Sequence, residues 1–194
     1  MNLIIKLLQK IYKRFYYKLK LNKLIANGLS LGKNVTIMPK VSIDRRYPYL
    51  ISIGNNCSLS NGVIILAHDA ASFKFTNGYT RLGKVDIKDN CYIGTNAIIL
   101  PGVTIGPDVL IAAGSVVNKN IPPNSCVAGV PARVYSKFDD FINHHMEMIK
   151  LTPFIDYNDF NSPDADFKEK VKKMLDENQI YIKGYQGKFP WTLD

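Results

Sequence analysis

The sequence is poor in cysteine and histidine, which limits the covalent and metal-based frameworks open to it. Three cysteines and three histidines occur among 194 residues. Cys57, Cys91 and Cys126 are too few for the disulfide scaffold of a small secreted domain, so we expect free thiols in a reducing, cytoplasmic compartment. Cys57 and Cys91 fall at apolar positions of a sequence repeat and are expected to pack as small buried hydrophobes.

Long apolar runs are missing, and acidic residues are missing from the first part of the chain. No segment reaches the roughly eighteen unbroken apolar residues that a transmembrane helix requires. The first acidic residue is Asp44. The excess of basic residues that gives the chain its formal charge of +9 is therefore concentrated mainly near the N-terminus. This basic excess fits an acidic partner such as a nucleotide, a phosphorylated sugar carrier or a membrane surface, and we predict no nucleic-acid partner.

Residues 1–25 alternate apolar and basic residues near helical spacing. Lys6 and Lys10 interrupt any signal-peptide core, and no small-residue cleavage site follows. We expect either a helix that caps the exposed strands of the fold or a helix that makes peripheral contact with a membrane surface. The two expectations are compatible.

What the sequence does contain is an aliphatic residue at every sixth position. The longest series is Ile87, Ile93, Ile99, Ile105, Ile111 and Val117. The same spacing links Leu31, Ile37 and Ile43, and it resumes after a four-residue insertion at Ile53, Leu59 and Ile65. A period of six fits neither a helix nor a simple alternating strand, so it predicts a repeat architecture.

The repeat predicts an all-β core, a parallel β-helix of hexapeptide repeats. Three hexads make one triangular coil of about eighteen residues, with one short parallel strand on each side. The aliphatic residue points inward, and Gly, Asn and Asp fill the corners. A second inward position lies four residues later, at Val35, Val41, Cys57, Val63, Cys91, Ala97, Val103 and Val109. A sandwich with chance spacing is the alternative, and two registers running over five or six repeats disfavour it.

The chain divides into three predicted parts. Residues 1–28 form a basic amphipathic helix, and residues 29–135 form the β-helix domain. Residues 66–84 interrupt the hexads as an excursion loop, and a long loop that leaves a rigid repeat is usually functional. Residues 136–194 form a C-terminal extension, a tail that is partly helical and partly irregular.

His68 is the residue on which we expect the chemistry to depend. It opens the excursion loop directly after an inward strand position, so a rigid coil holds its backbone. An imidazole is the natural general base near pH 7. His144 and His145 lie in a charged, helical segment outside the repeat and are expected to be exposed helix residues.

Two stretches resemble the hexapeptide-repeat acetyltransferases of the galactoside and maltose O-acetyltransferase type, and also the sugar acyltransferases of surface-polysaccharide gene clusters. These stretches are LAHDA at residues 66–70 and YIGTNAIILPGVTIGPDVLIAAGSVVNKNIPPNSCVAGVPARV at residues 92–134. The resemblance implies a left-handed coil and an acetyl-CoA-dependent transfer to a sugar hydroxyl, without a metal. It also implies a homotrimer whose donor groove lies between subunits.

The resemblance also implies roles for individual residues. His68 falls on the family's catalytic histidine, and Asp69 is a weaker candidate for the carboxylate that orients it. The positions implied for binding acetyl-CoA are Tyr92, Thr95, Ala113, Asn118, Lys119, Pro131 and Arg133. Among these, Lys119 and Arg133 suit the phosphate charges of coenzyme A.

Three alternatives stay open beside O-acetyl transfer. N-acetyl transfer to an amino sugar is the first, because an amine relies less on a strong base. A γ-type carbonic anhydrase shares the coil but needs three coil histidines around zinc, and only His68 lies in this region. A catalytically silent binding scaffold would not need both the loop histidine and the donor motif. The Asn-rich acceptor block of galactoside-type relatives is replaced by Thr-Ile-Met-Pro-Lys at residues 36–40, so the acceptor is not specified.

Overall fold

The computed structural model describes residues 17–156, 165–177, 179–183 and 192–193. The chain divides into two compact units, residues 1–138 with 191–194, and residues 139–190. Each unit is described separately below. Within the described ranges, no helix is both long enough and apolar enough to cross a membrane.

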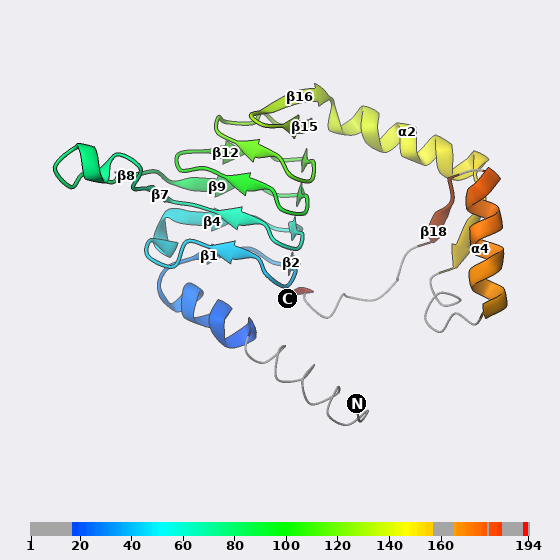
Figure 1. Ribbon diagram of the computed structural model, residues 1–194, viewed down its shortest axis with the longest axis horizontal. Helices are drawn as coiled ribbons and strands as arrows, with labels where there is room; N and C mark the ends of the chain where they lie inside the picture. Colours follow the sequence, from blue (N-terminus) through cyan, green and yellow to red (C-terminus); the bar gives the residue numbers. More distant parts are fainter. Residues whose placement is uncertain (1–16, 157–164, 178, 184–191, 194) are drawn as a thin grey trace. The chain divides into compact units, whose positions relative to one another are not determined.

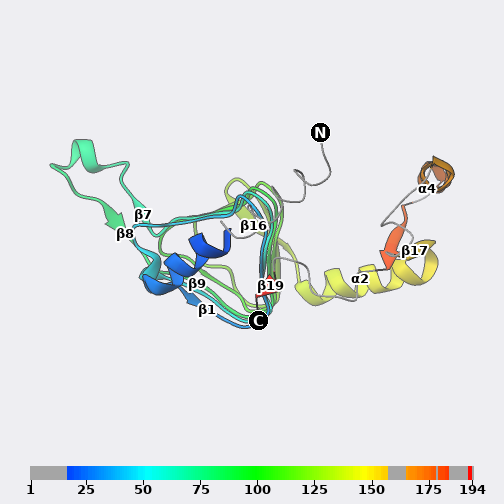
Figure 2. The same cartoon turned by 90° about the horizontal axis from the view of Figure 1, so that it is seen from below.

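The first unit is a stack of triangular coils whose three sides are sheets A, B and C (Figures 1 and 2). Sheet A contains β1 (Ser30–Leu31), β4 (Ile51–Ile53), β9 (Val85–Ile87) and β12 (Thr104–Ile105). The coil strands of sheet B are β2 (Val35–Ile37), β5 (Ser58–Leu59), β10 (Cys91–Ile93), β13 (Val109–Ile111) and β15 (Ser125–Gly129). Sheet C contains β3 (Ser42–Ile43), β6 (Ile64–Ile65), β11 (Ile98–Ile99) and β14 (Val116–Val117). All neighbouring coil strands are parallel, and the predicted parallel β-helix is confirmed.

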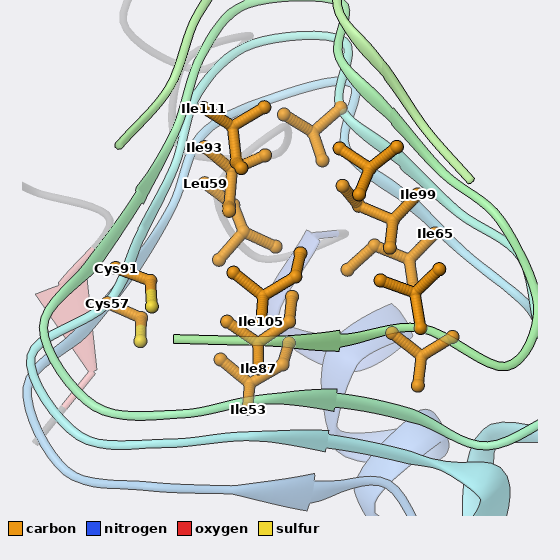
Figure 3. Packing of buried hydrophobic residues seen from close by; sticks show 14 of the residues in the cluster. Ile53, Cys57, Leu59, Ile65, Ile87, Cys91, Ile93, Ile99, Ile105 and Ile111 are labelled. Carbon is orange, nitrogen blue, oxygen red and sulfur yellow. The ribbon is translucent and has the colours of Figure 1, made fainter. Parts of the chain in front are cut away.

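The hexad residues form three internal ladders, one on each sheet (Figure 3). The strand register pairs Ile53 with Ile87 on sheet A, and it pairs Ile65 with Ile99 on sheet C. From Ile53 onward every hexad residue of the prediction is at most 2% exposed. Stacking like residues in successive coils removes their apolar surface from water, which is the main stabilising contribution in a repeat fold. Cys57 and Cys91 are buried free thiols within this core, as predicted.

A helix at residues 17–26 precedes the first coil (Figure 1). Its Leu24, together with Leu29 just beyond the helix, is buried in the same cluster as the ladder residues, and Leu21 packs against that cluster. The described part of the helix therefore covers apolar surface that the first coil would otherwise expose. The rest of the predicted N-terminal segment, residues 1–16, lies outside the described residues.

The strands are joined at three corners, which repeat from coil to coil. At the corner between sheets A and B, Asp108 and four asparagines (Asn34, Asn56, Asn90 and Asn124) adopt positive φ values near 55°. Four of these side chains form a ladder in which Asn34 donates to Asn56, Asn56 to Asn90, and Asn90 to Asp108, over 2.9, 3.2 and 3.0 Å. Asparagine tolerates this conformation and adds a coil-to-coil hydrogen bond, which explains its use at the corners.

The corner between sheets C and A, here called corner CA, carries both insertions. Residues 44–50 join β3 to β4 and contain the 3₁₀ helix η1 (Pro48–Leu50). Residues 66–84 join β6 to β9 and contain β7 (His68–Asp69), η2 (Phe73–Phe75) and β8 (Arg81–Leu82). β7 and β8 pair antiparallel, and the loop projects away from the coil stack in both views (Figures 1 and 2).

The coil stack ends in an antiparallel pair formed by β15 and β16 (Ala132–Ser136). β19 (Thr192–Leu193) pairs antiparallel with β2 at the other edge of sheet B. The helix α2 (Phe138–Leu151) follows β16. The second unit contains most of α2, β17 (Phe154–Asp156), α4 (Ala165–Glu177) and β18 (Tyr181–Lys183), with β17 and β18 parallel.

The two histidines of α2 differ in their surroundings. His144 is exposed, as predicted. His145 is only partly exposed, because its ring packs edge-on against Phe141 and its Nδ1 lies 2.8 Å from the hydroxyl of Tyr181. The contact with β18 gives His145 a structural role that the sequence analysis did not predict.

Candidate active site

His68 forms a hydrogen-bonded contact with Asp44, which lies on the neighbouring coil. Nδ1 of His68 lies against Oδ2 of Asp44. The histidine side chain is 31% exposed and the aspartate side chain only 2%. A buried carboxylate thus holds one nitrogen of an imidazole that remains open to solvent, which is the arrangement of a positioned general base.

The carboxylate of Asp44 is itself fixed by the backbone. The amide of Ala67 donates to Oδ2 over 3.0 Å, and the amide of Arg46 donates to Oδ1 over 3.0 Å. Burial by itself raises the pKa of Asp44, but the hydrogen bonds from His68, Arg46 and Ala67 and the charge of His68 hold that pKa below its ordinary value. Asp44 is therefore ionised near neutral pH and accepts a hydrogen bond from the Nδ1–H group of His68. The lone pair of His68 is then on Nε2.

Strand register explains how a residue distant in sequence reaches His68. Ile43 pairs with Ile65 in sheet C, so the residue after Ile43 lies beside the segment that follows Ile65. That residue is Asp44, and the segment contains Ala67 and His68. The sequence analysis missed Asp44. The available signal was that both insertions interrupt the hexads at the same side of the coil, which places their first residues next to one another.

Asp69 does not contact His68 in the part of the chain that the structure describes. Its carboxylate accepts a hydrogen bond from the amide of Ala71 over 2.9 Å, within its own loop. Successive residues of a strand point to opposite faces, and His68 and Asp69 form β7. Asp44, and not Asp69, is therefore the carboxylate that contacts the imidazole in the described structure.

Tyr47, from the insertion at residues 44–50, packs its ring against the imidazole of His68. The rings of Tyr47 and His68 are 5.3 Å apart and meet edge to face. Tyr47 in turn contacts the exposed ring of Tyr49, with ring centroids 6.3 Å apart. Tyr47, like Asp44, was not predicted as a site residue, and both come from the insertion at residues 44–50.

Two of the predicted donor-binding residues lie at the same corner as His68. Asn118 and Lys119 are exposed at corner CA, directly after β14. β6 and β14 are separated in sheet C only by β11, so they are two strand spacings, or roughly 10 Å, apart along the stack. Pro131 and Arg133 lie in and beside the turn from β15 to β16, and both are exposed.

The other predicted donor-binding residues lie at the opposite end of sheet C. Thr95 and Ala113 are exposed in the turns from sheet B to sheet C, here called corner BC. The amide of Gly114 donates to the carbonyl of Thr95 over 2.8 Å, which joins the two turns. Tyr92 on β10 is 46% exposed and accepts a hydrogen bond from Ser60. Within one chain, His68 at corner CA and the residues Thr95 and Ala113 at corner BC therefore lie at different corners of the coil.

Glycine at corner BC allows the two turns to stack closely. A Cβ at Gly94 would lie 2.6 Å from the amide nitrogen of Ala113, closer than any real side chain permits. The two turns thus stack closely and present the small, exposed residues Thr95 and Ala113 on the surface. Among the described residues, no three His, Cys, Asp or Glu side chains cluster as metal ligands at this or any other position.

The comparisons with known proteins agree with this architecture. Residues 84–119 match the family model described as bacterial transferase hexapeptide (six repeats), and residues 51–67 match that of the hexapeptide repeat of succinyl-transferase. The chain is 35% identical over 161 residues to Protein CapG of Staphylococcus aureus, covering 79% of this chain and 90% of that protein. It is 37% identical over 99 residues to the galactoside O-acetyltransferase of Escherichia coli K12, covering 50% of this chain and 49% of that protein.

Among solved structures, the chain is similar to a maltose O-acetyltransferase from Clostridium difficile 630, with 32% identity and a TM-score of 0.49 over 59% of this chain and 72% of that chain. The extent of the match to the staphylococcal protein shows the family. The chain belongs to the hexapeptide-repeat acetyltransferases and is an acyltransferase.

Proposed function

We propose that this protein is an acetyl-CoA-dependent O-acetyltransferase that acetylates a hydroxyl of a sugar or sugar conjugate used in surface-polysaccharide synthesis. The observation that carries the proposal is the Asp44–His68 pair at corner CA. In the same proposal the coil is left-handed, as the resemblance to the family implies. The galactoside O-acetyltransferase relative supports a sugar as acceptor.

His68 is proposed to act as the general base. Asp44 keeps the ring proton on Nδ1, so Nε2 takes the proton from the acceptor hydroxyl as its oxygen attacks the acyl carbon of the thioester. The C–S bond then breaks, and the proton on Nε2 passes to the departing sulfur, which leaves as the free thiol of coenzyme A. The contact with Tyr47 and the backbone amides on Asp44 fix the ring before substrate arrives. Direct transfer of this kind depends on holding donor and acceptor in line, and it needs no acyl-enzyme.

The residues at both ends of sheet C fit coenzyme A chemically. The donor supplies an activated acetyl thioester. The side chains of Thr95 and Ala113 are small and exposed, and a Cβ at Gly114 would meet no atom within 4 Å, so this corner leaves room for a pantetheine arm. Lys119 and Arg133 are exposed and, in the described part of the chain, form no salt bridge with a carboxylate, so both are available to phosphate groups.

A hydroxyl acceptor fits the observed pair better than an amine does. A sugar hydroxyl is a weak nucleophile until a base removes its proton in the transition state. An amine is nucleophilic as soon as it is unprotonated. A histidine held by a buried carboxylate, which two backbone amides fix in turn, therefore favours O-transfer over N-transfer to an amino sugar.

A product screen tests the proposal directly. Purified protein is incubated with acetyl-CoA and a panel of sugars, sugar phosphates and nucleotide sugars, and mass spectrometry scores a gain of one acetyl group. Mild alkali, which cleaves esters and leaves amides intact, distinguishes O-acetyl from N-acetyl products. Products stable to alkali would replace the proposal by N-transfer, and acyl transfer from other thioesters alone would change the donor.

Lys119→Ala and Arg133→Ala are expected to raise the KM for acetyl-CoA more than they lower kcat. Phosphate contacts far from the reacting carbon bind ground state and transition state alike, so their loss appears in KM. We expect about 5- to 50-fold in KM for each variant, the range of a lost charge-assisted hydrogen bond. Lys88→Ala is the control, since that lysine is paired with Asp86 on sheet A. A loss confined to kcat would contradict the assignment.

We further propose that the active enzyme is a homotrimer in which corner CA of one subunit faces corner BC of the next. The support is that one chain carries the two halves of the proposed site at opposite ends of sheet C. A cyclic arrangement of three triangular coils brings unlike corners together, and each interface then forms one complete site.

Mixed trimers test the shared site. His68→Ala removes the base, and Ala113→Trp blocks the donor corner, so each variant alone should be inactive. In trimers assembled from equal amounts of both, random assortment gives intact sites at about a quarter of the interfaces. We therefore expect about a quarter of the parent activity. Sedimentation should give three times the 21.9 kDa chain mass. A fully active monomer, or no recovery in verified mixed trimers, would refute the model.

A further inference from the structure

A basic pocket lies beside the Asp44–His68 pair, on the side of the N-terminal helix. It has a volume of about 430 Å³. The residues that line it are Lys20, Lys23, Leu24 and Asn27 from the helix region, and Arg45 and Arg46 from the first insertion. Four of these six side chains are cationic, and none is acidic.

The cations of the pocket are not neutralised within the protein. None of them forms a salt bridge with a carboxylate in the described ranges, and no acidic residue precedes Asp44 in the sequence. Asp44 itself is buried and committed to His68 and two backbone amides. Like charges gathered around one cavity repel one another, so an anion bound there gains from all four.

The pocket is physically linked to the reacting group. The backbone amide of Arg46 donates to Asp44, while its side chain lines the pocket. Its guanidinium carbon lies 6.0 Å from the ring centre of Tyr47, and that ring lies 5.3 Å from the ring of His68. The ring of Tyr47 therefore contacts both the imidazole of His68 and the guanidinium of Arg46.

The proposed donor residues lie in the other direction along the stack. Lys119 follows β14, which is on the far side of β11 from β6. The pocket is formed at the first coil, by the segment that follows β3, the opposite edge strand of sheet C. Cations thus lie on both sides of His68 along the stack. Those near β14 are assigned to the phosphates of the donor, which leaves the cations of the pocket free for another anion.

We infer that this pocket binds the phosphate or diphosphate group of the acceptor, so that the acceptor is a sugar carried on a phosphate ester. This inference rests on the proposed function, in which the acceptor is the molecule that receives the acetyl group. Nucleotide-linked sugars and lipid-linked sugars both carry a diphosphate, so either kind of acceptor would fit the pocket. The sugar extends from the cations past Tyr47, which brings a hydroxyl to Nε2 of His68.

Inorganic pyrophosphate is the probe for the first test, measured by isothermal titration calorimetry at low salt. The double variant Lys23→Gln with Arg45→Gln removes two pocket charges and touches neither Asp44 nor His68. The matched control is Lys18→Gln with Lys33→Gln, two exposed lysines that do not line the pocket. We expect the pocket variant to bind pyrophosphate about 10- to 100-fold more weakly, as expected for two lost charge-assisted contacts, and the control to match the parent.

Several results would overturn the inference. The parent failing to bind pyrophosphate at millimolar concentration is one, and equal weakening in both double variants is another, since that indicates diffuse charge. If the pocket variant loses affinity for coenzyme A as strongly as for pyrophosphate, the pocket belongs to the donor. If phosphatidylglycerol vesicles bind through the pocket residues while pyrophosphate does not, the pocket is a membrane contact instead.

Two further ligands distinguish the source of the diphosphate. Uridine diphosphate binding more tightly than pyrophosphate assigns a nucleotide-linked sugar, and geranyl diphosphate binding more tightly assigns a lipid-linked one. Either result supports the inference. If the protein binds neither ligand, the inference is overturned. His68→Ala should bind pyrophosphate as the parent does, so these measurements stay informative even if acetyl transfer is not found. The failure of this inference and the failure of the proposed function are therefore separable.

Discussion

His68→Ala is expected to lower kcat for acetyl transfer by about 10²- to 10⁴-fold, the usual contribution of a general base. The affinity for coenzyme A should stay within about twofold of the parent, because the residues proposed to bind it lie at other positions of the stack. Single-turnover transfer and equilibrium binding of coenzyme A, measured on the same preparation, separate the two effects. Activity within threefold of the parent would remove His68 from the mechanism.

His144→Ala is the matched control for this experiment. It removes an exposed imidazole from α2, far along the chain from corner CA. The parent activity should be retained. Equal loss in both variants would point to a general effect of losing a histidine rather than to the chemistry at His68.

Asp44→Asn is the second substitution with a large expected effect. The amide keeps the size of the carboxylate but loses its charge, and its NH₂ group meets Nδ1 as a donor. The ring of His68 is then favoured in the tautomer whose Nε2 carries the proton and cannot accept one. We expect kcat to fall about 10²- to 10³-fold, while the KM for acetyl-CoA stays close to that of the parent.

Asp69→Asn is the comparison that decides between the two carboxylates. The side chain of Asp69 accepts only a loop amide in the described structure, so its substitution should cost less than about threefold in kcat. A larger loss for Asp69→Asn than for Asp44→Asn would return the orienting role to Asp69 and contradict the geometry.

The same substitution changes the dependence of stability on pH. The pKa of Asp44 is lower in the folded protein than its ordinary value of 3.8, so the ionised group stabilises the folded state above that value. This contribution is lost as the pH falls through the lowered pKa. Urea unfolding between pH 7 and pH 3 should therefore show a smaller acid-induced loss of stability for Asp44→Asn than for the parent. Equal slopes would mean that the pKa of Asp44 is not lowered in the folded protein.

The sequence by itself determined the coil and one member of the Asp44–His68 pair. Each hexad residue must stack on the equivalent residues of the coils above and below it in order to be buried from water. The spacing of the series from Ile87 to Val117 was therefore sufficient to predict the positions of the strands and the residues of the core. His68 was recognisable because it follows an inward position at the start of a break in the repeat. The buried thiols of Cys57 and Cys91 followed from the same register.

Only the tertiary structure decided which residues contact His68 and where the basic side chains gather around a pocket. Asp44 is hidden in the sequence because its distance from His68 is set by the pairing of Ile43 with Ile65, and not by any local pattern. The basic pocket has the same origin, since Lys23 and Arg45 meet only where the N-terminal helix crosses the first insertion. Insertions have no repeat period of their own, so the contacts between them depend on folded packing that the hexad pattern does not encode.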